Sequence, residues 1–484
     1  MRKLFKYIII CSIVVCFYAC KKDLSAPPQN AKVDGNTILD QATAQIALNG
    51  VYYNFANATT IKTSWQMHEI IPASFAGYIQ NGLGPSPMDL NQTYTYTTPT
   101  QGYWLECYKT LNAANGLIKG VTALDDNKFT NNRKKSIIAE AHFLRAYAHF
   151  KLLNFYGEWY KPDSKLGILL RDETSSLSNI SKARSSVKDS YDFIINDLDD
   201  AIANAPATNV NYYVTKWAAM ALKMRVLICR AAAGDYTLII NLANTIIQNS
   251  PYTLEAKQED IFHSKGLSSS EIILGIKPQS LQATAPYSKS LQYYPIASSL
   301  YVASLSLKNI YANDPRLNWM IGTATPNTAK YAPNTTYFMK YILQGGIPTT
   351  VSESDYPLRL TEVYLLAAES IVRSGGDMAA AKTLVHTIQS KAAITATVNN
   401  TNYLAVESAN TTDLMLFEIY KETVRSMVAE DGSEWNALLR LPLTTVMQIK
   451  PTITSQNQYI LPIPANEFLY NPLFGDQNPG YSKN

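Results

Sequence analysis

The feature that most constrains the fold is an apolar stripe running through residues 137–155. Apolar side chains recur there at spacings of three and four residues, which predicts one buried face of a helix. The stripe consists of Ile137, Ala141, Leu144, Ala148, Leu152 and Phe155. Alanines stand between the large side chains, so a neighbouring helix can approach closely. Gly157 follows the stripe, and we expect it to provide the backbone freedom of a C-terminal cap.

The same periodicity recurs over most of the chain. Ser186 followed by Asp189 resembles a capping box, and Pro206 follows the end of the helix that it opens. We therefore expect helices at 39–57, 103–124, 133–156, 186–204, 215–232, 236–249, 359–374, 377–392 and 412–429.

Two segments follow one plan, in which a helix, a Gly-Asp turn and a second helix succeed one another. They are residues 215–249, with the turn at Gly234-Asp235-Tyr236, and residues 359–392, with the turn at Gly375-Gly376-Asp377. Each is close to the length of a tetratricopeptide helix pair. We predict a mostly α fold, an α-α superhelix of tetratricopeptide-like stacked helix pairs with long irregular insertions and a few short strands.

Two segments, 58–102 and 262–357, differ in character from the helical parts. They are rich in turn formers and aromatic residues, and the second contains strand-like runs at Glu271–Ile276 and Tyr337–Leu343. Long irregular insertions on a rigid frame are where binding surfaces usually lie.

The N-terminus has the pattern of a bacterial lipoprotein signal. Arg2, Lys3 and Lys6 precede a 12-residue apolar run that ends at Ala19-Cys20. This run is too short to span a bilayer. We expect residues 1–19 to be a signal peptide, Cys20 to be acylated, for example with palmitate, and residues 20–35 to be a lipidated linker. The alternative is an ordinary cleaved signal in which Cys20 has no role.

Composition restricts the class of partner. Of the formal charge of +4, three units lie in the signal segment, so the remainder is nearly neutral. This argues against nucleic acid or a polyanion as the main partner. Beyond Cys20 only Cys107 and Cys229 remain, both within apolar helical patterns, and they are expected to be buried thiols.

The sequence contains no motif of a catalytic, metal or cofactor site. His142 and His149 lie seven residues apart, too far along one helix to share a metal. No HExxH, Cys-pair, GxSxG or P-loop pattern is present. A pair of carboxylates for glycoside cleavage is defined by spatial distance, and nothing in the sequence points to one. We therefore predict no metal, no cofactor and no enzymatic activity.

Four segments together resemble the SusD/RagB family of outer-membrane nutrient-binding lipoproteins. They are AEAHFLRAYAHFKLLNFYGE at 139–158, LRLTEVYLLAAE at 358–369, ETVRSMVAEDGSEWNALLR at 422–440 and YILPIPANEFLYNPLFGDQNPGY at 459–481. The third departs from the family pattern: Glu434 replaces a family Arg, Ala437 replaces an acid, and the arginine-rich run is reduced to Arg425. These changes are expected to affect local packing more than activity.

The resemblance implies a single SusD-like body over residues 36–484. Its helical scaffold would occupy about 36–57, 103–261 and 358–440. The insertions at about 58–102 and 262–357 would face the ligand, and 441–484 would close the fold. The charged stretch Lys21-Lys22-Asp23 after the lipidated Cys implies display at the cell surface, anchored in the outer membrane.

The resemblance also implies a non-catalytic protein that binds a nutrient oligosaccharide and passes it to a SusC-like TonB-dependent transporter. The alternatives are a lipoprotein glycoside hydrolase, an adaptor that binds only its transporter, and a receptor for a peptide nutrient. The chain has 32 Tyr against 14 Phe, and tyrosine suits a wet surface that stacks on sugars. Candidate ligand residues in the insertions are Trp65, Tyr78, Asn81, Asn91, Gln92, Tyr94, Tyr96, Tyr293, Tyr294 and Trp319.

Overall fold

The computed structural model describes residues 37–59, 67–95, 98–284, 288–293, 300–325, 335–341 and 347–483. Its longer helices are α2 (Gln41–Phe55), α4 (Thr98–Thr122), α5 (Arg133–Tyr156), α6 (Val187–Asn204), α7 (Lys216–Arg230), α8 (Asp235–Asn249), α13 (Leu360–Arg373), α14 (Met378–Ser390) and α16 (Thr412–Met427). Every helix predicted from periodicity is present. The largest difference is that α4 begins at Thr98, several residues before the predicted start.

Shorter elements connect these helices. The short helices are α3 (Ile70–Ala76), α9 (Lys289–Tyr293), α10 (Leu305–Ile310), α11 (Leu317–Met320), α12 (Thr350–Glu353), α15 (Thr401–Ser408), α17 (Ser433–Leu439), α18 (Leu443–Ile449) and α19 (Ala465–Tyr470). The strands are β1 (Ile79–Asn81), β2 (Ile272–Ile276), β3 (Tyr301–Ala303), β4 (Ile321–Thr323), β5 (Thr336–Phe338) and β6 (Asp355–Arg359).

The strands pair antiparallel as β1–β3, β2–β6 and β4–β5. The predicted strand at 271–276 corresponds to β2. The one predicted at 337–343 corresponds only at its start to β5, and its residues 342–343 lie outside the described residues.

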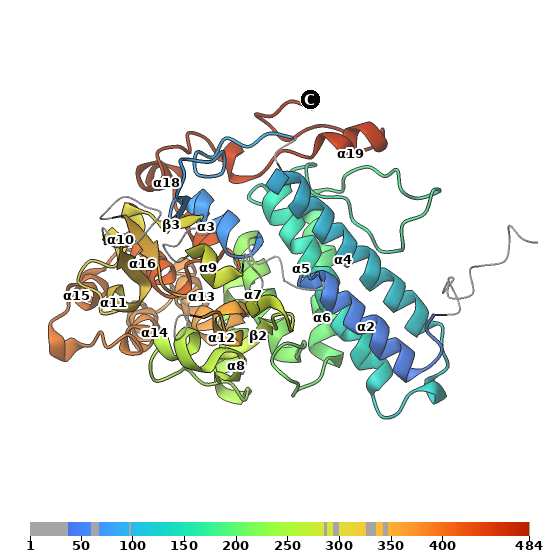
Figure 1. The fold of residues 1–484 in the computed structure, drawn as a ribbon, viewed down its shortest axis with the longest axis horizontal. Helices are drawn as coiled ribbons and strands as arrows, with labels where there is room; N and C mark the ends of the chain where they lie inside the picture. The colour runs from blue at the N-terminus through green and yellow to red at the C-terminus, as the bar shows by residue number, and fades with distance from the viewer. Residues whose placement is uncertain are drawn as a thin grey trace, which may run out of the picture.

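The long helices stack in chain order into a superhelix. Helix α4 packs against α5, α5 against α6, α6 against α7, and α7 against α8. Helix α8 then packs against α13, and α13 packs against α14. Figure 1 shows α2, α4, α5 and α6 side by side at one end of the molecule, with α14 and α16 toward the other. The left-handed turn residue Gly234 (φ 85°) directly precedes α8, and Gly375 (φ 69°) follows α13, as the repeated plan predicts. The tetratricopeptide-like scaffold is thus confirmed.

The ends of two helices show how local sequence sets the boundaries. Ser186 caps α6 by accepting a hydrogen bond from the Asp189 backbone N–H at 3.0 Å, as predicted. The reason for Gly157 after α5 differs from the prediction, because its φ is −106° and needs no glycine. A Cβ there would lie 2.7 Å from Leu153 Cδ1 and 3.1 Å from the Leu153 carbonyl oxygen, so close packing against Leu153 favours glycine.

A buried charge cluster joins helices that are distant in sequence. Asp431, in the turn between α16 and α17, pairs with Lys151 of α5 at 2.8 Å and with Arg225 of α7. Arg225 also pairs with Glu362 of α13 at 2.5 Å. Burial opposes the ionisation of Asp431, but the surrounding cations overcome it and hold its pKa far below the ordinary range. The cluster therefore joins α5, α7 and α13 to the turn that carries Asp431.

The C-terminal segment closes one side of the scaffold, and in Figure 1 it runs with α18 and α19 across the top of the view. The Asn478 side chain donates hydrogen bonds to the carbonyl oxygens of Tyr156 (2.8 Å) and Leu461 (2.7 Å). These bonds seal the C-terminal end of α5 against the closing segment.

The predicted membrane anchor and the two remaining cysteines can be compared with the structure. Cys20 and the signal segment lie outside the described residues. Among the helices that the structure describes, none combines the length and apolar character needed to cross a bilayer. Cys107 and Cys229 are free thiols, Cys229 buried and Cys107 partly so.

Candidate functional site

The two aromatic-rich insertions meet at a short sheet. Strand β1 of the first pairs with β3 of the second, and Asn81 lies opposite Tyr301. The ladder extends at both ends, because Gly82 N–H donates to the Leu300 carbonyl at 2.7 Å and Ser304 N–H donates to the Tyr78 carbonyl at 2.9 Å. Segments more than 200 residues apart in sequence therefore form one surface.

Three of the nominated ligand residues lie in the interior. Tyr78 is buried, and its hydroxyl is hydrogen-bonded to that of Tyr420. Tyr293 is buried and donates its hydroxyl to Glu69 at 2.9 Å. Asn91 is buried and donates to the Phe75 carbonyl at 3.2 Å. Burial leaves these rings and this amide without a face for a sugar, so they are not retained as ligand contacts.

The remaining nominated residues that the structure describes are more accessible. Gln92 is exposed, and Tyr94 has half of its surface exposed (50%). Asn81 is half-buried and caps its own turn by accepting the Leu83 N–H at 2.9 Å. Half-buried Trp319 stacks on Phe262 with ring centroids 6.0 Å apart. Trp65, Tyr96 and Tyr294 lie outside the described residues.

A hollow lies beside the scaffold. It is bounded by α2, the segment before α7, the segment after β2, and α12. We call it the tyrosine cleft. It is an open cleft with a volume of about 500 Å³, within the range of small-molecule sites. Its lining comprises Asn49, Tyr52, Tyr53, Phe55, Ala56, Tyr212, Tyr213, Gly275, Ile276, Lys277, Pro278, Gln279, Ser280, Ala283, Thr350 and Glu353.

One wall of the cleft is built by adjacent tyrosines on α2. Tyr52 is buried and donates its hydroxyl to Glu140 at 2.7 Å, while accepting the Val214 N–H at 2.8 Å. Burial, and then the charge of Glu140, raise the pKa of Tyr52 well above its ordinary value, so it remains a neutral donor. The next residue, Tyr53, also lines the cleft and keeps 40% of its surface exposed.

The opposite wall is held by a close backbone approach. Gly275 N–H donates to the Asn211 carbonyl at 2.7 Å, which ties the segment before α7 to β2. A Cβ on Gly275 would lie 2.2 Å from Leu267 Cδ2, so the absence of a side chain there leaves room for Leu267. Tyr212 and Tyr213, which follow Asn211 in the chain, are half-buried, and their ring centroids lie 5.0 Å apart. Tyr213 also meets Tyr52 edge-on at 4.9 Å.

The polar groups of the cleft are mostly neutral. Asn49, Gln279, Ser280 and Thr350 offer amide and hydroxyl groups, and Lys277 is exposed at the mouth. Glu353 is fully buried and is bound from within the protein by the backbone N–H groups of Lys289 (2.7 Å) and Ser290 (3.0 Å). Exposed tyrosine rings beside neutral hydrogen-bonding groups can stack on sugar C–H faces and bind hydroxyls.

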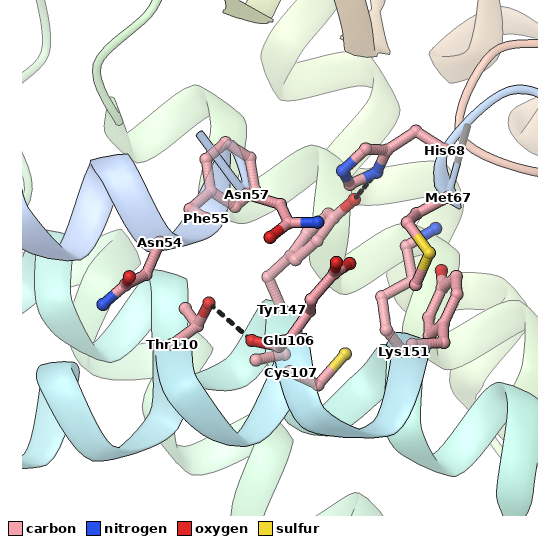
Figure 2. Close-up of a pocket in the computed structure, with 12 residues that line it drawn as sticks. Asn54, Phe55, Asn57, Met67, His68, Glu106, Cys107, Thr110, Tyr147 and Lys151 are labelled. Carbon is pink, nitrogen blue, oxygen red and sulfur yellow. Dashed lines mark hydrogen bonds between the residues drawn. The ribbon is translucent and has the colours of Figure 1, made fainter. Parts of the chain in front are cut away.

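A second hollow, shown in Figure 2, lies between the end of α2, α4 and α5. Its volume of about 30 Å³ suits roughly one water molecule and excludes a sugar ring. The Tyr147 hydroxyl and His68 Nδ1 lie 3.2 Å apart at its wall, as Figure 2 shows, and both contact Asp431 of the buried charge cluster. Burial raises the pKa of Glu106 there. We interpret this hollow as part of the scaffold.

Tyr53, Tyr212 and Tyr213 were not among the predicted ligand residues, because they belong to segments assigned to the scaffold or its turns. One signal was available. Adjacent residues of a helix point about 100° apart, so the Tyr52-Tyr53 doublet on a predicted helix favours one ring nearer the surface than the other. No comparable signal places the Tyr212-Tyr213 doublet beside α2, because that contact is long-range.

Comparison with known proteins gives matches along most of the chain. A family profile described as "Starch-binding associating with outer membrane" matches residues 20–228, and a "SusD family" profile matches residues 282–481. A SusD-like protein of Bacteroides ovatus is 25% identical over 284 residues, which is 56% of this chain and 49% of that protein. The chain thus spans about half the length of that relative. SusD-like protein P2 of Formosa agariphila is 21% identical over 98% of both chains.

Solved structures share the fold at low identity. A SusD superfamily protein from Bacteroides thetaiotaomicron has a TM-score of 0.76 and 22% identity, covering 91% of this chain and 100% of its own. A laminarin-binding SusD-like protein has a TM-score of 0.72 and 18% identity, covering 92% and 100%. The two consecutive profile matches, the order of the sequence segments and the shared architecture lead to one conclusion: this chain belongs to the SusD/RagB family.

Proposed function

We propose that the protein is a non-catalytic, lipid-anchored receptor of the outer membrane that binds a nutrient oligosaccharide in the tyrosine cleft. It would pass the oligosaccharide to a SusC-like TonB-dependent transporter. The observation that carries this proposal is a cleft of about 500 Å³ faced by Tyr53, Tyr212 and Tyr213 among neutral polar groups. The accessible residues of the joined insertions, Tyr94 and Gln92, offer a second contact surface for a longer glycan.

The chemistry of the cleft favours a sugar over a wholly apolar ligand. A pyranose presents C–H groups on one face and hydroxyls around its edge. Each aromatic contact contributes about 0.5–1.5 kcal/mol, so two or three tyrosines are needed for useful affinity. The laminarin-binding structural neighbour, itself a glycan binder, supports this class of ligand.

The carboxylates argue for binding without cleavage. In most families of glycoside hydrolases, two carboxyl groups flank the bond that is cleaved. Among the described residues of the tyrosine cleft the single carboxylate is Glu353, which is fully buried and bound by backbone N–H groups. A carboxylate held in this way cannot reach a bound sugar.

The anchor and the transporter rest on other observations. The basic residues, the apolar run and Cys20 are typical of a lipoprotein signal, and the profile that begins at residue 20 is described as associating with the outer membrane. Membership of the SusD/RagB family suggests that the partner is a SusC-like TonB-dependent transporter. Purification of the tagged, membrane-anchored chain should therefore recover a barrel protein of the outer membrane.

The test uses a soluble form without residues 1–20, titrated calorimetrically with a panel of oligosaccharides. We expect heat from at least one class and a Tyr212→Ala variant with about two- to tenfold weaker affinity, since one stacking contact is lost. Tyr470→Ala, which removes an exposed tyrosine of α19, should bind normally. Binding of peptides alone would refute the carbohydrate part, and new products after prolonged incubation would refute the non-catalytic part.

A further inference from the structure

Lys277 occupies a fixed place at the mouth of the tyrosine cleft. It directly follows β2, and the next residue is the buried Pro278, whose ring restricts the backbone. Its ammonium lies 5.3 Å from the centroid of the Tyr212 ring. The cation and the proposed stacking surface are therefore neighbours, and a ligand lying on Tyr212 would meet Lys277.

The charge of Lys277 is not balanced within the cleft. Among the described residues, no carboxylate forms a salt bridge with it. Glu353 is directed inward and accepts hydrogen bonds from Lys289 N–H (2.7 Å), Ser290 N–H (3.0 Å) and Ser290 Oγ (2.6 Å). Its charge is thus directed at interior donors, whereas the exposed Lys277 ammonium lies over the Tyr212 ring at the lining of the cleft.

A single local cation is compatible with a nearly neutral protein. The near-neutral charge argues against a partner recognised over a large surface as a polyanion. It does not oppose one charge-assisted hydrogen bond to an anionic group on a ligand already held by stacking. Because Lys277 is exposed, such a bond adds modest affinity that salt weakens.

We propose that the tyrosine cleft selects oligosaccharides that carry an anionic substituent, a carboxylate or a sulfate ester. The anionic group lies against the Lys277 ammonium while a neighbouring sugar ring stacks on Tyr212. Asn49, Gln279 and Thr350 serve the neutral hydroxyls. This selectivity rests on the proposed binding function and narrows its ligand class.

The experiment compares matched pairs of oligosaccharides by calorimetry with the soluble protein. One pair is a uronic-acid oligosaccharide and its carboxyl-reduced counterpart, and the other is a sulfated oligosaccharide and its desulfated counterpart. We expect the anionic member of at least one pair to bind about two- to fivefold more tightly at low salt, the size of one ion pair at an exposed site. The preference should shrink as NaCl rises.

Two variants assign the effect to Lys277. Lys277→Gln should lose the preference while keeping the affinity for the neutral member, and Lys277→Arg should retain it. Lys165→Gln removes an exposed lysine that is not part of the cleft and should behave as wild type. Since Lys277 is exposed, the melting temperatures of all forms should agree.

The outcomes separate the two proposals. Equal binding of neutral and anionic members, or a preference that survives in Lys277→Gln, overturns the selectivity while oligosaccharide binding stands. Absence of binding by every member of both pairs and of the wider oligosaccharide panel overturns both. A preference confined to one pair supports the selectivity and identifies the substituent as carboxylate or sulfate.

Discussion

Tyr52 and Tyr53 are adjacent residues of α2 that have different roles. The Tyr52 hydroxyl joins Glu140 to the backbone at Val214 and so positions the segment before α7. The Tyr53 ring stays at the surface of the cleft, where 40% of the residue is exposed. The buried tyrosine shapes the wall, and the exposed one offers a contact to a ligand.

Glu434 is a residue whose charge the fold opposes. It is fully buried in α17, and one of its carboxylate oxygens accepts the Ala429 N–H at 3.1 Å. The other oxygen has no hydrogen-bond partner among the described residues. Burial raises the pKa of Glu434 from 4.5 to about 8. Glu434 is therefore mostly neutral in the folded protein at pH 7.

This burial predicts a dependence of stability on pH. Because the folded pKa exceeds the unfolded one, the contribution of Glu434 is fully present below pH 4.5 and is lost as the pH rises through about 8. Glu434→Gln keeps an oxygen acceptor and cannot ionise. We expect the variant to match wild type near pH 5 and to exceed it at pH 9 by an amount on the order of a few kcal/mol.

Urea unfolding of both proteins at pH 5 and pH 9 measures this difference. Comparison of the two proteins at each pH cancels the titration of other groups. A difference between them that stays constant from pH 5 to pH 9 would show that Glu434 does not titrate in this range.

At the scale of elements, a bidentate ion pair joins α13 to the end of α17. Arg440 Nε and one of its terminal nitrogens donate to the two oxygens of Glu369 at 2.8 and 2.6 Å. Arg373 adds a third bond at 2.8 Å. Burial opposes the charge of Glu369, but the two arginines overcome it and lower its pKa to about 2.

Removing this carboxylate should destabilise the protein strongly. Glu369→Ala leaves the buried Arg440 without a partner, and we expect a loss of about 3–5 kcal/mol in the free energy of unfolding at pH 7. The wild-type contribution is present above pH 4.5 and is lost as the pH falls toward 2, since the folded pKa is lowered.

Denaturant unfolding of Glu369→Ala and of wild type at pH 7 measures this loss in the free energy of unfolding. Asp192→Ala serves as the matched control, because Asp192 pairs with Lys188 on the exposed side of α6 and should cost less than about 1 kcal/mol. Equal losses in the two variants would contradict the importance of the buried pair.

The helices could be predicted because their information is local. The spacing of apolar residues, the Ser186 cap and the two Gly-Asp turns act over a few residues, and each is found in the structure. The position of Gly157 was also indicated, although its reason is the nearby Leu153 side chain, which the sequence pattern does not reveal.

The site was harder to predict because burial within insertions depends on distant residues. Tyr78 is covered by a contact with Tyr420, 342 residues later, and Tyr293 by Glu69, 224 residues earlier. Nothing in the local sequence distinguishes these tyrosines from the exposed Tyr94. Aromatic content therefore located the insertions and could not separate their interior rings from their surface rings.

At the scale of the whole molecule, the superhelix acts as a frame that several buried ion pairs hold rigid. The cluster around Asp431 joins α5 to α7, and Arg225 extends it to α13. Arg359 of β6 pairs with Glu430 at 2.6 Å and so ties the end of β6 to the same turn. The cleft walls thus belong to elements fixed by the interior, which favours a preformed site for a ligand.

The central claim is that a nutrient glycan is held by contact in the tyrosine cleft. A crystal structure of the soluble protein with the tightest-binding oligosaccharide of the panel tests it most directly. We predict a sugar ring stacked on Tyr212 or Tyr53, with its hydroxyls bonded to the neighbouring polar side chains. An oligosaccharide bound elsewhere on the molecule, with the tyrosine cleft empty, would contradict the account.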